Sequence, residues 1–142
     1  MQSPAWVDIH AHVAGFSRGG VEAGAFGARQ GVGVLIDAGS GPPDELPSRL
    51  DAVAAATDAT AVFAWANICA EGIAGRGCEA HDISGSAARR ALEADPGRVV
   101  GIKLQTSNTR LGGRAFEAIE NAKRVAADFG APLPVHVGNP PP

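Results

Sequence analysis

Apolar runs and amphipathic stretches alternate along this chain. Five runs rich in apolar and β-branched residues predict β-strands, at residues 5–13, 32–37, 61–66, 99–104 and 133–137. Between them, helices are predicted at residues 21–29, 47–57, 84–94 and 114–129. The first helix is expected to be short, because its two glycines lower the helix propensity. Strands that alternate with helical crossovers predict a parallel α/β sheet.

The strongest helical pattern covers residues 114–129. Apolar side chains recur there at spacings of three and four and predict one core-facing stripe, formed by Phe116, Ile119, Ala122, Val125, Ala126 and Phe129. Gly130 is expected to end the helix, and Pro132 cannot continue it.

Two architectures fit this alternation: an open doubly wound sheet and part of a (β/α)₈ barrel. Chemically active residues follow nearly every predicted strand, at or near its carboxyl end: His10, His12, Asp37, Ser40, Asn67, Lys103 and His136. Barrel enzymes build their sites from several strand ends, whereas an open sheet gathers its ligands at one switch point. The pattern therefore favours a barrel. A whole barrel needs about 250 residues, so the 142 residues predict a partial TIM (β/α)₈ barrel, strands one to five.

His10 and His12 are the first candidate pair for chemistry. Alternate residues of a strand point to the same face, so the two imidazoles should project together and could grip one metal ion. Each candidate also has a simpler reading. The two histidines could be metal-free surface or core residues, Lys103 could be a strand-end lysine or a phosphate binder, and His136 could be a core histidine bonded to backbone.

The amino-acid composition limits the classes of partner and the cellular compartments that fit this chain. The net charge of −3 gives no support for nucleic acid or an anionic membrane as a partner. No run approaches the ~20 apolar residues of a membrane span, and no signal-peptide pattern opens the sequence. Two cysteines are too few for a disulfide scaffold, so a reducing cytoplasm is expected. The spacing of Cys69, Cys78 and His81 fits no zinc ribbon or finger, and we expect loop residues there, with His81 facing the substrate entrance.

Three motifs together resemble the amidohydrolase superfamily: Asp8-Ile9-His10-Ala11-His12, Gly101-Ile102-Lys103 and Val135-His136-Val137-Gly138. Three local stretches, residues 37–40, 101–107 and 134–141, look like its dihydroorotase-like amidohydrolase or deacetylase branch. The resemblance runs from residue 5 to the last residue and covers the N-terminal part of the family's barrel.

The resemblance implies a site for two divalent ions, zinc or another metal. His10 and His12 would hold the more buried ion and His136 the more exposed one, while Lys103 would carry CO₂ as a carbamate that bridges both. A hydroxide shared by the ions would attack an amide or ester carbonyl. The implied function is hydrolysis of carbon–nitrogen (non-peptide) or ester bonds in a small acylated amine or ester. The alternatives are a dihydroorotase-like hydrolase of cyclic amides and a non-catalytic truncated chain.

Several neighbouring positions bear on specificity. Similar deacetylases tend to have Arg in place of Gln105 and an acid in place of Asn139, which leaves the substrate class open. Ser107 could contact substrate or cap the following loop, and substrate contact is slightly favoured. Asp37 and Ser40 are expected to order the second βα loop rather than perform chemistry.

The family also takes a metal-binding His from strand six and a proton-shuttling Asp from strand eight. Residues 1–142 are therefore expected to form an incomplete barrel domain, without strands 6–8, the flanking β-sandwich segment or a catalytic acid. We expect such a chain to be inactive alone. Its open edges should also make it poorly soluble or prone to self-association.

Overall fold

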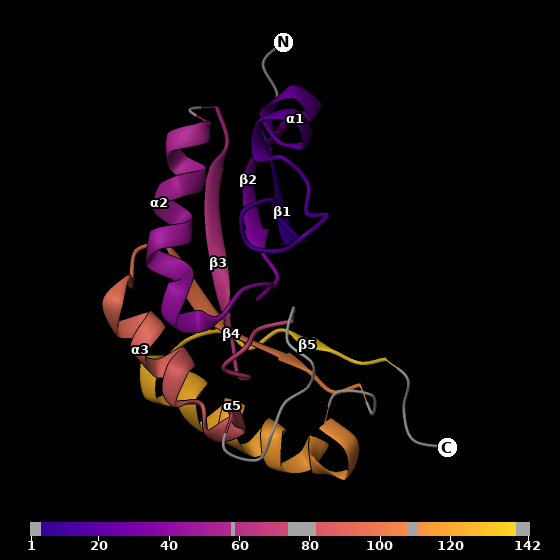
Figure 1. The fold of residues 1–142 in the computed structure, drawn as a ribbon, viewed down its shortest axis with the longest axis vertical. Coiled ribbons are helices and arrows are strands. Elements are labelled where there is room, and N and C mark those ends of the chain that lie inside the picture. Colours follow the sequence, from indigo (N-terminus) through magenta and orange to yellow (C-terminus); the bar gives the residue numbers. More distant parts are fainter. Residues whose placement is uncertain (1–3, 58, 74–81, 108–110, 139–142) are drawn as a thin grey trace.

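The computed structural model describes residues 4–57, 59–73, 82–107 and 111–138 (Figure 1). Strands and helices alternate as the hydrophobic pattern predicts. The strands are β1 (Trp6–Ala11), β2 (Val32–Asp37), β3 (Ala61–Asn67), β4 (Val99–Gln105) and β5 (Val135–His136). The α-helices are α1 (Ala23–Phe26), α2 (Leu46–Ala56), α3 (Ser86–Ala94) and α5 (Ala115–Phe129), with 3₁₀ turns η1 (Ala28–Gln30), η2 (Pro43–Glu45), η3 (Asp82–Ser84) and η4 (Gly112–Arg114). The weak helix predicted at 21–29 is thus two short pieces, α1 and η1, on either side of Gly27.

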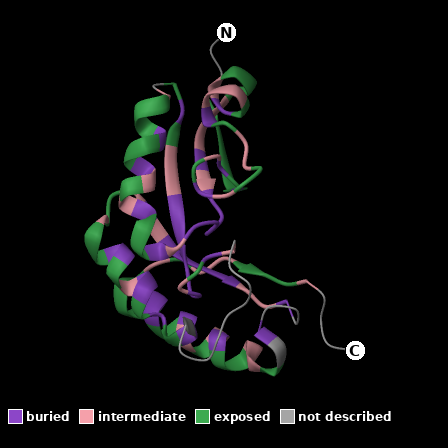
Figure 2. Ribbon diagram, viewed as in Figure 1, coloured by how far each residue is buried: buried purple, intermediate pink, exposed green. Residues whose placement is uncertain are grey.

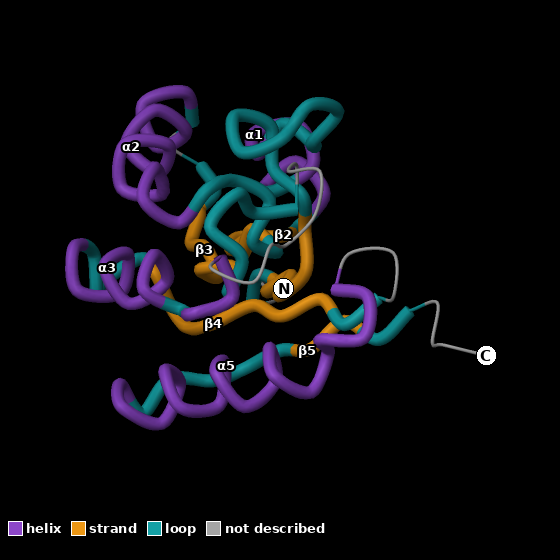
Figure 3. The backbone as a smooth tube through the Cα atoms, turned by 60° about the horizontal axis from the view of Figure 1, so that its bottom comes forward, coloured by secondary structure: helices purple, strands orange, loops and turns teal. Residues whose placement is uncertain are grey.

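The strands form one parallel sheet in the order β1-β2-β3-β4-β5. Each strand lies beside the one before it, so the order contains no switch point of the kind that an open doubly wound sheet has. Helices α2, α3 and α5 follow one another in an arc around the outside of the strands (Figure 3). This arrangement is half of a TIM barrel, which confirms the predicted fold class.

The apolar core lies between the strands and this arc of helices. Helix α2 packs against β3, α3 against β3 and β4, and α5 against β4. Alanines supply much of the contact surface on the last two helices, among them Ala88, Ala91, Ala118 and Ala122. Short side chains allow a helix to approach the sheet closely.

The predicted apolar stripe of α5 is partly wrong. Ala122, Val125 and Ala126 are buried as expected, but Phe116 is 82% exposed and Phe129 is also exposed. Ala118 takes the buried place in the first turns instead. The stripe of α5 that faces β4 is lined by small residues. The sequence pattern was read from the large apolar side chains, and it therefore placed Phe116 and Phe129 in the stripe wrongly.

The two outer strands are open. Strand β1 is exposed along nearly its whole length and β5 is exposed, whereas the inner strand β4 is largely buried (Figure 2). Ile9 on β1 is 62% exposed, and Val137, just after β5, is 74% exposed. No helix in the described part of the chain is long and apolar enough to cross a bilayer.

Candidate functional site

The register of the sheet brings the predicted site residues to one edge. Asn67 pairs with Lys103 across β3 and β4, and Gln105 pairs with His136 across β4 and β5. On the other side of the half barrel, Ala11 pairs with Asp37. Because all the strands are parallel, their carboxyl ends meet at the same edge, where barrel enzymes place their chemistry.

The four candidate ligands converge at this edge. The amine of Lys103 lies 3.4 Å from Nε2 of His10. The His10 ring centroid lies 5.9 Å from that of His12 and 6.3 Å from that of His136. The convergence expected from the sequence is therefore present, although His12 follows the end of β1 rather than lying within it.

Lys103 is deeply buried, with 2% of its surface exposed. Burial lowers the pKa of its amine, and the negative charge of Asp37 opposes this shift. Among the described residues, no carboxylate forms an ion pair with Lys103. The pKa of His10 is also lowered, first by desolvation of the ring and then by Lys103, His12 and His136, while Asp8 opposes the shift. Both groups are thus biased toward their neutral forms, which bind metals and react with electrophiles.

Asp37 and Ser40 form a buried polar pair beside His12. The carboxylate of Asp37 accepts hydrogen bonds from the backbone N–H of Val13 (3.0 Å) and of Ser40 (2.7 Å), and from the Ser40 hydroxyl (2.8 Å). Oγ of Ser40 lies 2.7 Å from Nδ1 of His12. As the sequence predicts, Asp37 orders the loop after β2, and it also holds the backbone that follows His12.

The loop after β2 closes over Lys103. A Cβ added to Gly39, whose φ is +74°, would lie 3.0 Å from Cβ and Cγ of Lys103. The Asn67 amide supports the loop from the other side, donating to the carbonyl of Gly39 (3.1 Å) and accepting from the N–H of Cys69 (3.0 Å). Asn67 therefore links the loop after β2 to the segment that follows β3.

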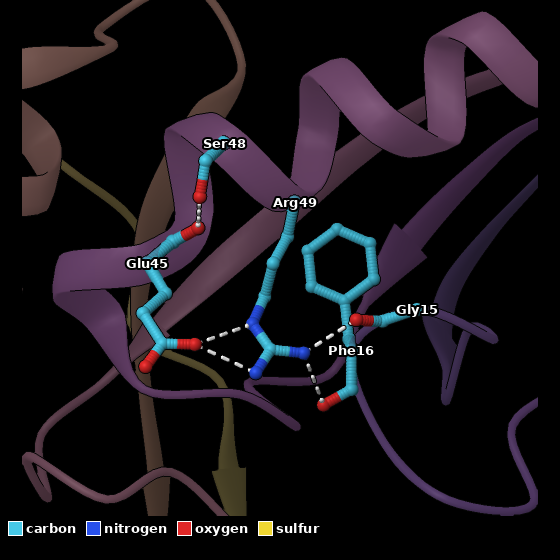
Figure 4. Close-up of polar contacts among 5 residues, drawn as sticks. All are labelled: Gly15, Phe16, Glu45, Ser48 and Arg49. Atoms are coloured by element: carbon cyan, nitrogen blue, oxygen red, sulfur yellow. Dashed lines mark hydrogen bonds and ion pairs between the residues drawn. The ribbon is translucent and has the colours of Figure 1, made fainter.

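The loop after β1 has an anchor that the sequence did not reveal. Arg49 on α2 donates to the carbonyls of Gly15 and Phe16 and to the carboxylate of Glu45 (Figure 4). Phe16 is buried against the core. The i, i+4 spacing of Glu45 and Arg49 could have indicated the ion pair, but not its long-range backbone contacts.

The remaining predicted site residues that the structure describes lie at the end of β4 or in the segments after β3 and β4. Ser107 is buried, and its carbonyl accepts from the N–H of Leu111, as a loop cap would; its contact with substrate stays a prediction. Oε1 of Gln105 is buried and has no hydrogen-bond partner among the described residues. Cys69 is buried and disulfide-bonded, which removes it as a free thiolate and departs from the expectation of reduced cysteines. The remaining loop candidates, Cys78, His81 and Asn139, lie outside the described residues.

An open cavity of about 570 Å³ adjoins the site. It is lined by His12 and Ser40, by Ser17, Arg18 and Gly19 of the loop after β1, and by Ile73. His12, which is exposed, thus forms part of the cavity wall.

The donor set fits a metal centre only if Lys103 takes part. In the part of the chain that the structure describes, no three His, Cys, Asp or Glu side chains form a group that could hold an ion. His10 and His12 would give two ligands, and an anionic group on Lys103 would give the third that zinc sites need. His10, whose pKa is lowered, and the buried Lys103 beside it suit this chemistry.

A parallel half barrel with imidazoles and a buried lysine at its carboxyl edge has the organisation of a TIM-barrel enzyme site. Comparisons with known proteins agree. The chain is 30% identical to proteins named deacetylase from Brucella anthropi and Enterococcus faecalis, over 98% and 99% of its own length. It spans only 36% and 38% of the length of these relatives.

Solved structures show the same shape. A crystal structure of an adenine deaminase matches with a TM-score of 0.87 and 29% identity, covering 99% of this chain and 39% of that one. A dihydroorotase also matches with a TM-score of 0.87, at 24% identity, covering 97% of this chain and 40% of that one. No family model matches the chain. The resemblance to the amidohydrolase superfamily is confirmed by the relatives named deacetylase and by the adenine deaminase, whereas the likeness to the dihydroorotase, at 24% identity, bears on the fold alone.

Proposed function

We propose that this chain supplies part of the active site of a metal-dependent hydrolase of the deacetylase type. Its substrate would be a small acylated amine or ester, cleaved at a carbon–nitrogen (non-peptide) or ester bond. The main support is the buried amine of Lys103, 3.4 Å from His10 at an edge shared with His12 and His136. The relatives named deacetylase support the reaction class.

Lys103 would act as a carbamate. The ammonium first loses one proton to solvent; the neutral amine then attacks CO₂, a nitrogen–carbon bond forms while one C=O π bond opens onto oxygen, and a second proton leaves to solvent. A buried ammonium is thereby replaced by an anionic carbamate. Burial, which lowers the pKa of the amine, favours the neutral form that this step requires. The change also provides the negative charge that three imidazoles lack.

His10 and His12, with the Lys103 carbamate, would hold one divalent ion, and His136 with the same carbamate would contribute to a second. When bound, zinc or another divalent ion would polarise a carbonyl and lower the pKa of water. The cavity beside His12 would admit the substrate from solvent.

We further propose that residues 1–142 are the first part of a longer barrel domain, since the chain spans 36% and 38% of the deacetylases it matches. A dihydroorotase-like hydrolase of cyclic amides would use the same site. The structural likeness to a dihydroorotase bears on the fold alone, so the deacetylase reading has the stronger support.

The test uses the 142-residue chain with zinc and ¹³C-bicarbonate. We expect a carbamate signal in ¹³C NMR that is absent from Lys103→Ala, and zinc affinity, measured by competition with a chromophoric chelator, that rises with bicarbonate. Loss of an outer-shell partner typically costs ~10–100-fold in metal affinity, so His10→Ala and His12→Ala, which each remove a direct ligand, should cost at least as much.

Lys123→Ala is the control, because Lys123 is an exposed lysine paired with Glu120. It should keep both the carbamate signal and the zinc affinity. Equal zinc binding by the original chain and the two histidine variants, or a carbamate signal that survives Lys103→Ala, would reject the proposal.

A further inference from the structure

We propose that Ser40 and Asp37 are positioning residues that fix the tautomer of His12, with the proton on Nδ1 and the lone pair on Nε2. The consequence for metal binding rests on the proposed function above. The tautomer itself depends only on hydrogen bonds within this chain.

The direction of the hydrogen bonds follows from the donors around Asp37. Backbone N–H groups only donate, and two of them, from Val13 and Ser40, point at the carboxylate, one to each oxygen. Asp37 is completely buried and accepts both bonds, so each of its two oxygens serves as a hydrogen-bond acceptor, as the oxygens of a carboxylate do. The Ser40 hydroxyl, 2.8 Å from Oδ2 of Asp37, must therefore be the donor to it.

A hydroxyl has a single proton, and that of Ser40 is committed to Asp37. Toward His12, Oγ of Ser40 can only accept, over a distance of 2.7 Å. Nδ1 of a neutral His12 must then bear the proton. Free imidazole side chains prefer the opposite tautomer, so the pair reverses an intrinsic preference.

The arrangement also restrains the ring and the backbone together. Asp37 binds the N–H of Val13, the residue after His12, while Ser40 binds the ring of His12. Metal-binding histidines commonly donate their second N–H to such an acceptor, which fixes the tautomer and the ring orientation. Here the acceptor is a serine, and the carboxylate acts through it.

The variant Ser40→Ala distinguishes the effect of Ser40 on the His12 tautomer from its effect on the structure of the loop after β2. It removes only the hydroxyl, and the two backbone bonds to Asp37 remain. The measurement is long-range ¹H–¹⁵N NMR of the His12 imidazole in the metal-free chain, at a pH where the ring is neutral. We expect the Nδ1–H form in the original chain and a shift toward the Nε2–H form in Ser40→Ala.

Three comparisons complete the test. Ser40→Thr, which keeps a hydroxyl, should restore the Nδ1–H form, and Ser48→Ala, which removes a hydroxyl bonded to the Glu45 carbonyl on α2, should not alter it. Zinc affinity, read by chelator competition with the metal alone, should fall ~10–100-fold in Ser40→Ala.

The outcomes distinguish the two proposals. An Nε2–H form in the original chain overturns the positioning role without any need for a variant, and no change of tautomer in Ser40→Ala overturns it as well. The expected tautomers without zinc binding by any form would support the positioning role and contradict the proposed function.

Discussion

Lys103 and Gly39 show how tightly single residues are fitted at this site. The stem of the lysine lies under a glycine whose φ of +74° few other residues adopt without strain. The same glycine lies in the segment between Asp37 and Ser40, whose N–H donates back to the Asp37 carboxylate. Local backbone geometry and the position of the lysine are therefore coupled.

Gly39→Ala tests this coupling. An added methyl would lie 3.0 Å from Cβ and Cγ of Lys103 and 3.2 Å from Nδ2 of Asn67. A left-handed backbone costs a non-glycine residue about 1–2 kcal/mol, and overpacking adds about 1–3 kcal/mol. We expect the free energy of unfolding, from urea denaturation followed by circular dichroism, to fall by the sum of both effects.

Gly31→Ala is the matched control for this measurement. Its φ of +82° is similar, but nothing lies within 4 Å of an added Cβ. It should show the backbone cost alone. Equal losses for the two variants would mean that the contact with Lys103 contributes nothing.

At the scale of elements, β1 and β5 are the strands at which the sheet could pair with another chain. Each pairs on one side only in the described chain, and their neighbourhoods expose Trp6, Val7, Ile9, Val135 and Val137. Unpaired strand edges with apolar side chains promote association.

We therefore predict that the 142-residue chain self-associates. Sedimentation velocity should show larger species as concentration rises, and Val7→Lys on β1 should reduce them. Phe116→Lys is the control, because Phe116 is an exposed apolar residue on helix α5 rather than on an outer strand. A monomer at every concentration, or an equal effect of the two variants, would contradict the role of the edges.

At the scale of the whole molecule, the half barrel leaves the candidate metal ligands open to solvent. His10, His12 and His136 are all exposed, while Lys103 is buried behind them. Fixed dipoles and charges act most strongly where water is excluded. The family that the chain resembles takes a further imidazole and a carboxylate from later strands, and β5 is the last strand among the described residues.

We predict no hydrolysis by the 142-residue chain alone, even with zinc and bicarbonate. Without a positioned acid–base group, general acid–base catalysis of about 10²–10⁴-fold is lost. The assay covers N-acyl amino acids, acetyl esters and dihydroorotate. Metal-dependent turnover that disappears in both His12→Ala and Lys103→Ala would contradict this expectation and show that an assembly of chains completes the site.

The sequence by itself determined the order of elements and the identity of the candidate ligands. Residues 32–37 were predicted as a strand with the observed bounds, because an apolar run between glycine-rich segments is a local signal. The placement of His10, His12, Lys103 and His136 at one edge followed from parallel topology alone. These features depend on periodicity and chain order, which a sequence displays directly.

Tertiary structure alone decided which groups touch. The exposure of Phe116 depended on how closely α5 approaches β4, and the contacts of Arg49 depended on a loop more than 30 residues away in sequence. The bond from His12 to Ser40 joins residues 28 apart. Hydrogen-bond direction and burial arise from such long-range packing, which no local pattern encodes, and at this site they set the state of Lys103 and of His12.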